Sequence, residues 1–274
     1  MYGSWLLGIP FSFTGHAADL YRERVALEDK IRRADFIVCI SEFHKTFFLN
    51  LGARPEQLHI VYCGIDVTHF SPAASPRQGK RAIHIVSSGR LVEKKGFLDL
   101  VDACSLLTAR GVSYRCTIGG NGPQELDIRE RIRHHGLEQQ VTVTGQALTQ
   151  EELPDFMREA DIYALPCIWA QDGDVDGLPQ MLMEAMSCEV PSISTNLVGI
   201  PDLIVDGQTG LLVEPGDSVQ LADAIQRLIE NPDMARSMAA AGRERVLRKF
   251  EINNALQPLI KLFENQLHAA RSHE

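Results

Sequence analysis

The amino-acid sequence predicts an α/β protein in which a complete, doubly wound parallel sheet follows a shorter, partial sheet of the same kind. From residue 82 onward, short runs rich in β-branched residues alternate with helical patterns, and a stretch of similar character precedes them. Strands that alternate with helices of this length are typical of βαβ units, whose parallel sheets are covered on both faces. The 274 residues leave room for two such domains.

The elements before residue 70 form the shorter series. The predicted strands are 10–16, 35–41 and 58–64, and the predicted helices are 20–34 and about 42–50. A complete sheet of this type has about five or six strands, so we expect the first domain to be incomplete at its N-terminus. Pro, Ser and Gly gather at 70–80 between two apolar segments, which predicts a linker.

The elements after this linker alternate regularly. The predicted strands are 82–89, 114–120, 141–145, 161–166 and 190–196, and the predicted helices are about 96–110, 124–135, 150–159 and 180–188. The stretch from 217 to 270 is predicted to be almost entirely helical. We therefore expect a partial domain at 1–75, a complete domain at 76–250, and a C-terminal helix at 251–274 that packs back toward the first domain.

Composition and charge exclude several classes of protein. The apolar fraction is 45% and the charged fraction 23%, which is typical of a globular protein with a sizeable core. The net charge of −9 argues against nucleic acid as the main partner, because such proteins carry a basic footprint. No window approaches the roughly 18 apolar residues of a membrane span, and the N-terminus lacks the pattern of a secretory signal.

The six cysteines predict neither a metal site nor a disulfide framework. None forms a C-x-x-C pair, and most lie in apolar runs such as "FIVCIS" and "YRCTIGG". We expect buried, reduced thiols and a reducing compartment.

The run "DGDVDGLPQMLMEAMS" at 172–187 is close to a calcium-binding loop. Asp172, Asp174, Asp176 and Gly177 match the first, third, fifth and sixth positions of that loop. Its twelfth position requires a bidentate glutamate, but Met183 stands there and the glutamate follows one residue later. The sequence therefore favours another role for these acids.

Several polar or glycine-rich segments follow the predicted strands. In α/β sheets of this type, ligands bind at the carboxyl ends of the strands. Glycines let backbone amides approach a phosphate, a helix N-terminus adds positive potential, and lysine or arginine supplies full charges. The residues concerned are Gly89, Arg90 and Lys95 after one strand, Gly120, Asn121 and Gly122 after the next, the acidic loop with Pro179, and His16 after a strand of the first domain. Together these segments predict a site for an anionic ligand.

Four motifs in this order resemble one family. "SSGRLVEKKGFLDLVDA", "IGGNGP", "DGLPQMLMEAMSCEVPSIST" and "GIPDLIVDGQTGLLVEPGD" look like those of retaining GT4-type glycosyltransferases, which have the GT-B fold of two Rossmann-like domains. "GIPFSFTGHAADLY" and "ADFIVCISEF" resemble the end of that family's N-terminal domain. The resemblance runs from about residue 8 to residue 250, with bacterial enzymes of exopolysaccharide and lipopolysaccharide assembly as the nearest relatives.

The resemblance implies a role for each of these side chains. Arg90 and Lys95 would neutralise the diphosphate of a nucleotide-sugar donor, a task that other glycosyltransferases give to a metal ion. The family's paired glutamates match Asp176, which would lie beside the donor sugar, and Glu184, which would accept hydrogen bonds from the ribose hydroxyls. His16 would reach the donor sugar from the first domain.

Other residues would contribute backbone. The amides of Gly177 and Leu178, just before Pro179, would lie near the distal phosphate. Backbone groups at 141–145, around Val143, would recognise the nucleotide base. Asp172 and Asp174 remain as a solvated rim of the acidic loop.

The implied function is transfer of a sugar from a UDP- or GDP-sugar to a glycan or lipid-linked acceptor, with retention of configuration. No metal or other cofactor is expected, and the expected location is cytoplasmic, with possible contact at the inner face of the membrane. Two alternatives stay open: a non-catalytic donor-binding module, and a GT-B-fold sugar-nucleotide epimerase. The spacing of Asp176 and Glu184 favours the transferase over the epimerase.

Overall fold

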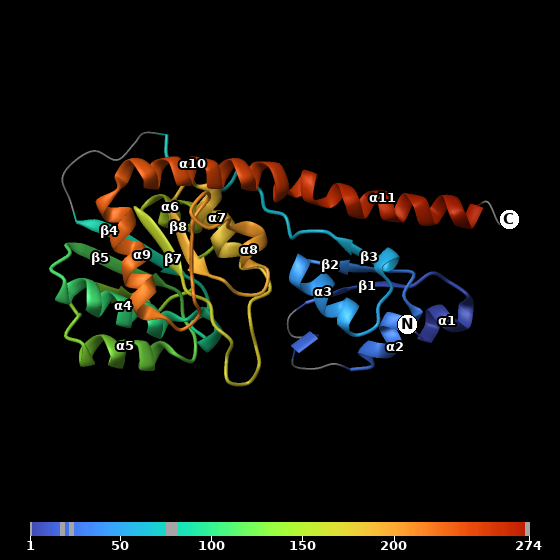
Figure 1. Ribbon diagram of the computed structural model, residues 1–274, viewed down its shortest axis with the longest axis horizontal. Helices are drawn as coiled ribbons and strands as arrows, with labels where there is room; N and C mark the ends of the chain where they lie inside the picture. Colours follow the sequence, from blue (N-terminus) through green and yellow to red (C-terminus); the bar gives the residue numbers. More distant parts are fainter. Residues whose placement is uncertain (1, 17–19, 22–24, 75–81, 272–274) are drawn as a thin grey trace.

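The computed structural model consists of two α/β units joined by two crossings of the chain (Figure 1). It describes residues 2–16, 20–21, 25–74 and 82–271. The first unit contains a three-stranded sheet and the second a six-stranded sheet. All strand pairs within the two sheets are parallel, so the predicted α/β fold class is confirmed.

The three-stranded sheet has the order β1-β2-β3. Its strands are β1 (Ser12–Gly15), β2 (Phe36–Cys39) and β3 (Leu58–Ile60), and its helices are α1 (Tyr2–Leu7), α2 (Leu27–Arg33), α3 (Glu42–Asn50) and the 3₁₀ turn η2 (Pro55–Gln57). Every residue of β2 is buried, as expected of a central strand with both faces covered.

Two helices of this unit differ from the expectation. The predicted helix 20–34 is interrupted: Leu20 and Tyr21 are π-helical, and α2 begins at Leu27, after Ala26 adopts a left-handed conformation. Residues 17–19 and 22–24 lie outside the described residues. The helix α1 was not predicted, because its apolar residues show no helical period.

The six-stranded sheet has the order β6-β5-β4-β7-β8-β9. Its strands are β4 (Ile83–Ser88), β5 (Tyr114–Gly119), β6 (Val141–Val143), β7 (Ile162–Leu165), β8 (Ser192–Thr195) and β9 (Leu211–Val213). The first five match the predicted strands, and β9 was not predicted. The chain moves outward from β4 to β6 and then returns to the other side of β4. The strand order therefore reverses between β4 and β7, where ligands of doubly wound sheets bind.

Helices cover both faces of this sheet (Figure 1). They are the 3₁₀ turn η3 (Glu93–Lys95), α4 (Phe97–Ala109), α5 (Glu125–His134), α6 (Leu153–Arg158), α7 (Gln180–Ser187), α8 (Ile200–Leu203) and α9 (Ser218–Glu230). An apolar stripe recurs at helical spacing along α4, and its residues are all fully buried in one continuous core: Phe97, Leu100, Val101, Cys104 and Leu107. All six cysteines are free thiols, and five of them are buried.

Two long helices complete the chain: α10 (Pro232–Lys249) lies over the six-stranded unit, and α11 (Ile252–Arg271) continues across the three-stranded unit (Figure 1). Leu259 and Leu262 of α11 pack on a small apolar cluster that includes Phe36 of β2. Residues 75–81 of the predicted linker lie outside the described residues, so the domain boundary near 75 stays a prediction.

Candidate functional site

The loop after β4 is shaped by one glycine and anchored by one leucine. Gly89 has a φ of +146°, which side chains rarely allow. The Lys95 side chain passes over it, because a Cβ on Gly89 would lie 3.3 Å from Lys95 Cε. Leu91 is fully buried, whereas Arg90 is exposed. The loop thus brings Lys95 back over the end of β4 and leaves Arg90 at the surface.

The loop after β5 rests on the backbone of this first loop. A Cβ on Gly120 would lie 1.9 Å from the Gly89 carbonyl oxygen, and a Cβ on Gly122 would lie 2.5 Å from that of Leu91. The Leu91 N–H donates to the Asn121 carbonyl at 2.8 Å. Only glycine leaves room for backbones this close, so the two loops form one rigid unit.

The end of β6 already uses part of its backbone. The carbonyl of Val143 accepts a hydrogen bond from Arg129 Nη2 at 3.0 Å. The Gly120 N–H donates to Thr144 Oγ1 at 3.0 Å. Gly120 therefore allows the close approach of the Gly89 backbone because it has no side chain, and its amide is already bonded to Thr144 after β6.

The acidic loop after β7 leads into α7. Pro179 precedes the helix as its N-cap, and its fixed φ suits that position. Leu178 is buried, and the Gly177 carbonyl accepts a hydrogen bond from the Gly199 N–H at 3.0 Å. These contacts hold the segment before α7 against the loop after β8.

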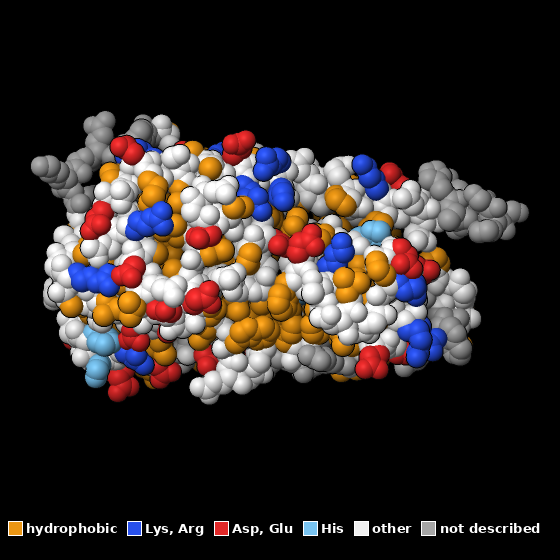
Figure 2. All heavy atoms as spheres, viewed as in Figure 1, with side chains coloured by type: hydrophobic (Ala, Val, Ile, Leu, Met, Phe, Trp, Pro, Cys, Tyr) orange, Lys and Arg blue, Asp and Glu red, His pale blue; other side chains and the backbone are white. Residues whose placement is uncertain are grey.

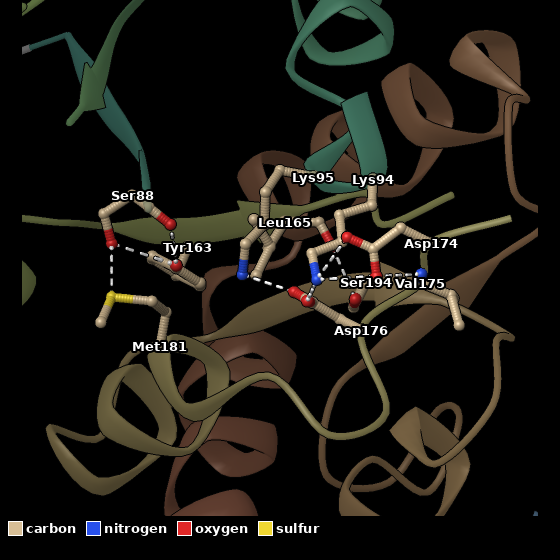
Figure 3. A network of polar contacts seen from close by, with 10 residues as sticks. All are labelled: Ser88, Lys94, Lys95, Tyr163, Leu165, Asp174, Val175, Asp176, Met181 and Ser194. Carbon is tan, nitrogen blue, oxygen red and sulfur yellow. Dashed lines mark hydrogen bonds and ion pairs between the residues drawn. The ribbon is translucent and has the colours of Figure 1, made fainter. Parts of the chain in front are cut away.

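Two lysines and two aspartates meet between the ends of β4 and β7, the reversal point of the sheet (Figure 3). Lys95 Nζ lies 2.5 Å from Asp176 Oδ2, and Lys94 Nζ lies 3.1 Å from Asp176 Oδ1. Lys94 Nζ is also 3.1 Å from Asp174 Oδ2. The four side chains are only 12–16% exposed. The structure therefore brings Lys95 and Asp176, two residues of the predicted site, into direct contact.

The charges of this cluster shift its pKa values. Burial raises the pKa of Asp176, but the ammonium groups of Lys95 and Lys94 outweigh it and hold that pKa below its ordinary value. Burial lowers the pKa of Lys94, but Asp176 and Asp174 raise it above the usual range. Asp176 and Lys94 are therefore both charged at neutral pH.

The expectation that Asp174 belongs to a solvated rim is wrong. Its carboxylate pairs with Lys94, a residue 80 positions away in the sequence, and only Asp172 is exposed as expected. Two lysine ammonium groups thus face the carboxylates that a calcium loop would use as ligands. Among the described residues, no group of three or more His, Cys, Asp or Glu side chains could hold a metal ion.

Glu184 is the second acid of the predicted pair. It lies on α7, eight residues after Asp176, and its side chain is directed into the protein with 4% exposed. Burial raises its pKa to about 7, against smaller opposing effects of His69 and Lys95. Its Oε2 atom is buried and has no hydrogen-bond partner within the described part of the chain. A buried carboxylate oxygen of this kind calls for an O–H or N–H donor.

His16 follows β1 at the carboxyl end of the three-stranded sheet and is exposed. This end faces the carboxyl end of the larger sheet: Glu42 N–H donates to Asp202 Oδ2 at 2.7 Å, and the rings of Tyr21 and Trp169 stack edge-on, 5.2 Å apart. Hydrophobic side chains gather where the two units meet, and charges of both signs are interspersed around them (Figure 2).

Sequence reasoning missed His44, on α3. It is fully buried against the backbone of Gly177, where an added Cβ would lie 2.9 Å from His44 Cε1. Neither ring nitrogen has a hydrogen-bond partner among the described residues. Burial, with a smaller contribution from His16, lowers its pKa to about 4, so the ring is neutral.

Lys94 was also missed, although the sequence carries a signal for it. Two adjacent lysines follow β4 and two alternating aspartates follow the neighbouring β7, which is the pattern of a charge-balanced cluster. For His44 there is no such signal, because a histidine on a helix face predicts nothing by itself.

Within the residues that the structure describes, we find no helix with the length and apolar character needed to cross a bilayer.

Family models cover most of the chain. The model described as glycosyl transferases group 1 matches residues 72–245, and the model described as glycosyltransferase family 4 matches residues 1–69.

Curated relatives come from bacterial polysaccharide and glycolipid synthesis. The putative colanic acid biosynthesis glycosyltransferase WcaL of Salmonella typhimurium is 33% identical over 234 residues, which are 84% of this chain and 57% of the relative. The amylovoran biosynthesis glycosyltransferase AmsK of Erwinia amylovora is 30% identical, over 91% of this chain and 62% of its own. A GDP-mannose-dependent phosphatidylinositol monomannoside mannosyltransferase of Mycobacterium tuberculosis is 31% identical, over 77% and 56%. The chain thus spans less than two thirds of each.

Solved structures share the fold at lower identity. HepE of Anabaena, solved in complex with UDP, has a TM-score of 0.83 at 19% identity and covers 96% of this chain and 74% of its own. Sucrose-phosphate synthase of Thermosynechococcus elongatus has a TM-score of 0.81 at 24% identity, over 98% and 71%. The arrangement of two parallel sheets is therefore GT-B-like, as predicted.

Proposed function

Because the chain belongs to the group 1 glycosyltransferases of the GT4 type, a retaining enzyme family, we propose that it binds a UDP- or GDP-sugar and transfers the sugar to a glycan or lipid-linked acceptor. The relatives assemble bacterial polysaccharides and glycolipids, and we place this chain in polysaccharide assembly. The proposed location is the cytoplasm, at the inner face of the membrane where the acceptor is lipid-linked.

The observation that carries this proposal is the buried, unpartnered Oε2 of Glu184 beside the lysine-rich reversal point of the sheet. A ribose offers two O–H donors to such a carboxylate, and its diphosphate offers an anion to Lys95 and Arg90. A nucleoside diphosphate carries both groups in one molecule. The rigid glycine loops at Gly89 and Gly120 fix the edge of the proposed phosphate site.

The remaining residues take roles around the reacting carbon. Asp176 lies beside the donor sugar, and His16 approaches it from the three-stranded unit. Transfer breaks the bond between the anomeric carbon and the diphosphate oxygen and forms one to the acceptor oxygen on the same face. The acceptor proton passes to the departing diphosphate. Negative charge grows on that leaving group, so cations placed on it stabilise the transition state.

Backbone groups complete the donor site in this proposal. Gly177 and Leu178 contribute amides near the distal phosphate, and Pro179 holds them at the start of α7. Gly122 and Asn121 border the phosphates, and the segment around Val143 borders the base. Here the hydrogen bond already made by Val143 leaves one lone pair of its carbonyl for the base.

Calorimetric titration with UDP-glucose and GDP-mannose tests the donor site. Wild type is expected to bind one of them, and Arg90→Ala and Glu184→Gln are expected to weaken binding by about tenfold or more, as the loss of a charged hydrogen bond does. The matched control is Arg110→Ala, which removes an arginine at the far end of α4. Equal affinities for wild type and both site variants would contradict the assignment.

The reaction itself is tested with a donor and an acceptor glycan. The product is expected to keep the anomeric configuration of the donor, which nuclear magnetic resonance reads directly. Donor binding without transfer to any acceptor would favour the donor-binding module instead. Conversion of a UDP-sugar into its epimer without an acceptor would favour the epimerase.

The pKa of Glu184 predicts a pH dependence of donor binding. The ribose hydroxyls need the ionised carboxylate, whose fraction falls below a pKa of about 7. Donor affinity should therefore drop by about tenfold from pH 8 to pH 6, because only the ionised fraction binds. Glu184→Gln should bind weakly at both pH values, and a wild-type affinity independent of pH would contradict the role.

A further inference from the structure

The lysine–aspartate cluster has an alternating order in space. Asp174, Lys94, Asp176 and Lys95 follow one another so that each inner charge touches two opposite charges (Figure 3). Lys94 bridges both aspartates, whereas Lys95 pairs with Asp176 alone among the acids in the described part of the chain. The cluster is neutral as a whole, and its four side chains are largely withdrawn from water.

This order raises a difficulty for donor binding by Lys95. Its ammonium lies 2.5 Å from Asp176 Oδ2, and an ammonium held there cannot give its full charge to a diphosphate. If Lys95 turned toward the donor alone, it would leave a buried carboxylate without a partner, which is strongly unfavourable. Some other cation has to stay with Asp176.

Lys94 is that cation by position. Its Nζ contacts the other oxygen of the same carboxylate, Asp176 Oδ1, at 3.1 Å. We propose that Lys94 is a positioning residue for the transfer reaction: it holds Asp176 when Lys95 moves from Asp176 to the donor diphosphate. This inference rests on the proposed function, which assigns the diphosphate to Lys95.

Asp174 keeps Lys94 from following Lys95. Its carboxylate oxygens lie 3.1 Å and 3.2 Å from Lys94 Nζ, and the Val175 N–H donates to Oδ1 at 2.9 Å. The main chain of Lys94 is tied to the same loop, since its carbonyl accepts a hydrogen bond from the Ile168 N–H at 3.0 Å. Lys94 is therefore fixed at both its backbone and its side chain, whereas Lys95 has one carboxylate to leave.

The test removes Lys94 without leaving a lone buried charge. Lys94→Met alone would strand Asp174 and could unfold the loop, so the informative variant is the neutral pair Lys94→Met/Asp174→Asn. A matched control is Arg110→Met/Asp223→Asn, which removes an ion pair at the opposite end of α4. Binding of UDP-glucose and GDP-mannose is measured by calorimetry, and stability by thermal unfolding, on the wild type and on each variant. Lys94→Arg, which keeps the charge and can still bridge two carboxylates, is the conservative variant.

If Lys94 holds Asp176, the neutral pair should unfold near the wild-type temperature yet bind the donor about tenfold more weakly, because Asp176 then retains Lys95. Lys94→Arg should keep the donor affinity within about threefold of the wild-type value. Wild-type affinity in the neutral pair would overturn the proposal and leave Lys94 as a structural partner of Asp174. A wild type that binds neither donor would overturn the proposed function itself, and with it this role.

Discussion

The two units hold their strand-end loops in different ways. In the loops after β4 and β7 of the six-stranded unit, backbone meets backbone: a Cβ on Gly96 would lie 1.8 Å from the Pro166 carbonyl oxygen. In the three-stranded unit, a Cβ on Gly15 would meet the side chains of Leu20 and Phe48, at 2.8 Å and 2.9 Å. Side chains can rotate away and a packed backbone cannot. The larger unit therefore presents a fixed edge to a ligand, and the smaller one an edge that can adjust.

One buried acid of the larger unit and one buried base of the smaller unit have pKa shifts in opposite directions. Burial raises the pKa of Glu184 and lowers the pKa of His44. His44 is buried against Gly177 of the larger unit, whereas Glu184 is buried on α7. As the pH falls, protonation should therefore lower the stability of the folded protein through His44 and raise it through Glu184.

The largest expected effect tests the backbone contact. Gly96→Ala combines a left-handed φ of +66° with the clash at Pro166, and it should lower the free energy of unfolding by about 4 kcal/mol. Gly111→Ala, with a φ of +73° and nothing within 4 Å, controls for the backbone alone and should lose about 1–2 kcal/mol. Gly15→Ala should lie below Gly96→Ala. Chemical denaturation measures all three, and equal losses for Gly96→Ala and Gly15→Ala would end the distinction between the units.

The next effect concerns His44. Its pKa of about 4 lies below the ordinary 6.5, so the unfolded chain takes up a proton that the folded ring refuses. As the pH falls from 6.5 to 4, wild type should lose about 3 kcal/mol of stability through this group. His44→Phe keeps a flat ring and should lack this loss. Parallel pH profiles for wild type and variant would show that the imidazole is solvated.

Glu184 should show an effect of similar size and opposite sign. Its pKa rises from the ordinary 4.5 to about 7 in the folded protein, so the protonated form is stabilised. The contribution is full below pH 4.5 and is lost as the pH rises through 7, by about 3 kcal/mol. Glu184→Gln should remove this part of the profile. Denaturation from pH 4 to pH 8 checks it, and a variant that retains the wild-type slope would contradict the buried carboxyl.

The smallest effect compares two helix caps. The Ser41 hydroxyl accepts from the His44 N–H at 3.2 Å in the smaller unit, and the Asp217 carboxylate accepts from the Gln220 N–H at 2.8 Å in the larger one. Ser41→Ala should cost about 2 kcal/mol, because Ser41 is fully buried, and Asp217→Ala about 1 kcal/mol, because water replaces it. Thermal unfolding measures the loss of stability in both variants. A larger loss for Asp217→Ala than for Ser41→Ala would indicate that water reaches Ser41 at the contact between the units.

The sequence was sufficient to predict what depends on local pattern. The strands of the larger sheet, the helical stripe of α4 and the positions of Glu184 and Lys95 follow from periodicity and from residues just after strands. The start of α2 was predicted too early, because charged residues of good helix propensity continue through a segment where the chain turns at Ala26.

What could not be predicted depends on pairing between distant segments. Asp174 looked solvated because nothing near it in the sequence is basic, and its partner Lys94 comes from the loop of another strand. His44 is buried by residues from both units, and no period reveals such a contact. The predicted roles of Arg90, Asp176 and His16 remain predictions, and the binding experiment with Arg90→Ala addresses the first of them.

The two chain crossings between the units lie side by side. The Ile65 N–H donates to the Phe250 carbonyl at 2.9 Å, and the Ile252 N–H donates to the Ile65 carbonyl at 3.0 Å. A Cβ on Gly64 would lie 2.6 Å from Ile252 Cα, so the backbones of the two connecting segments are in direct contact.

Because the two chain segments that join the units are hydrogen-bonded to each other, they can act together as one hinge. Sliding one unit past the other at this point would have to break both hydrogen bonds. Rotation about the hinge displaces each atom in proportion to its distance from the axis. A small rotation of one unit about Ile65 would therefore separate His44 from Gly177 by more than it moves the crossing itself.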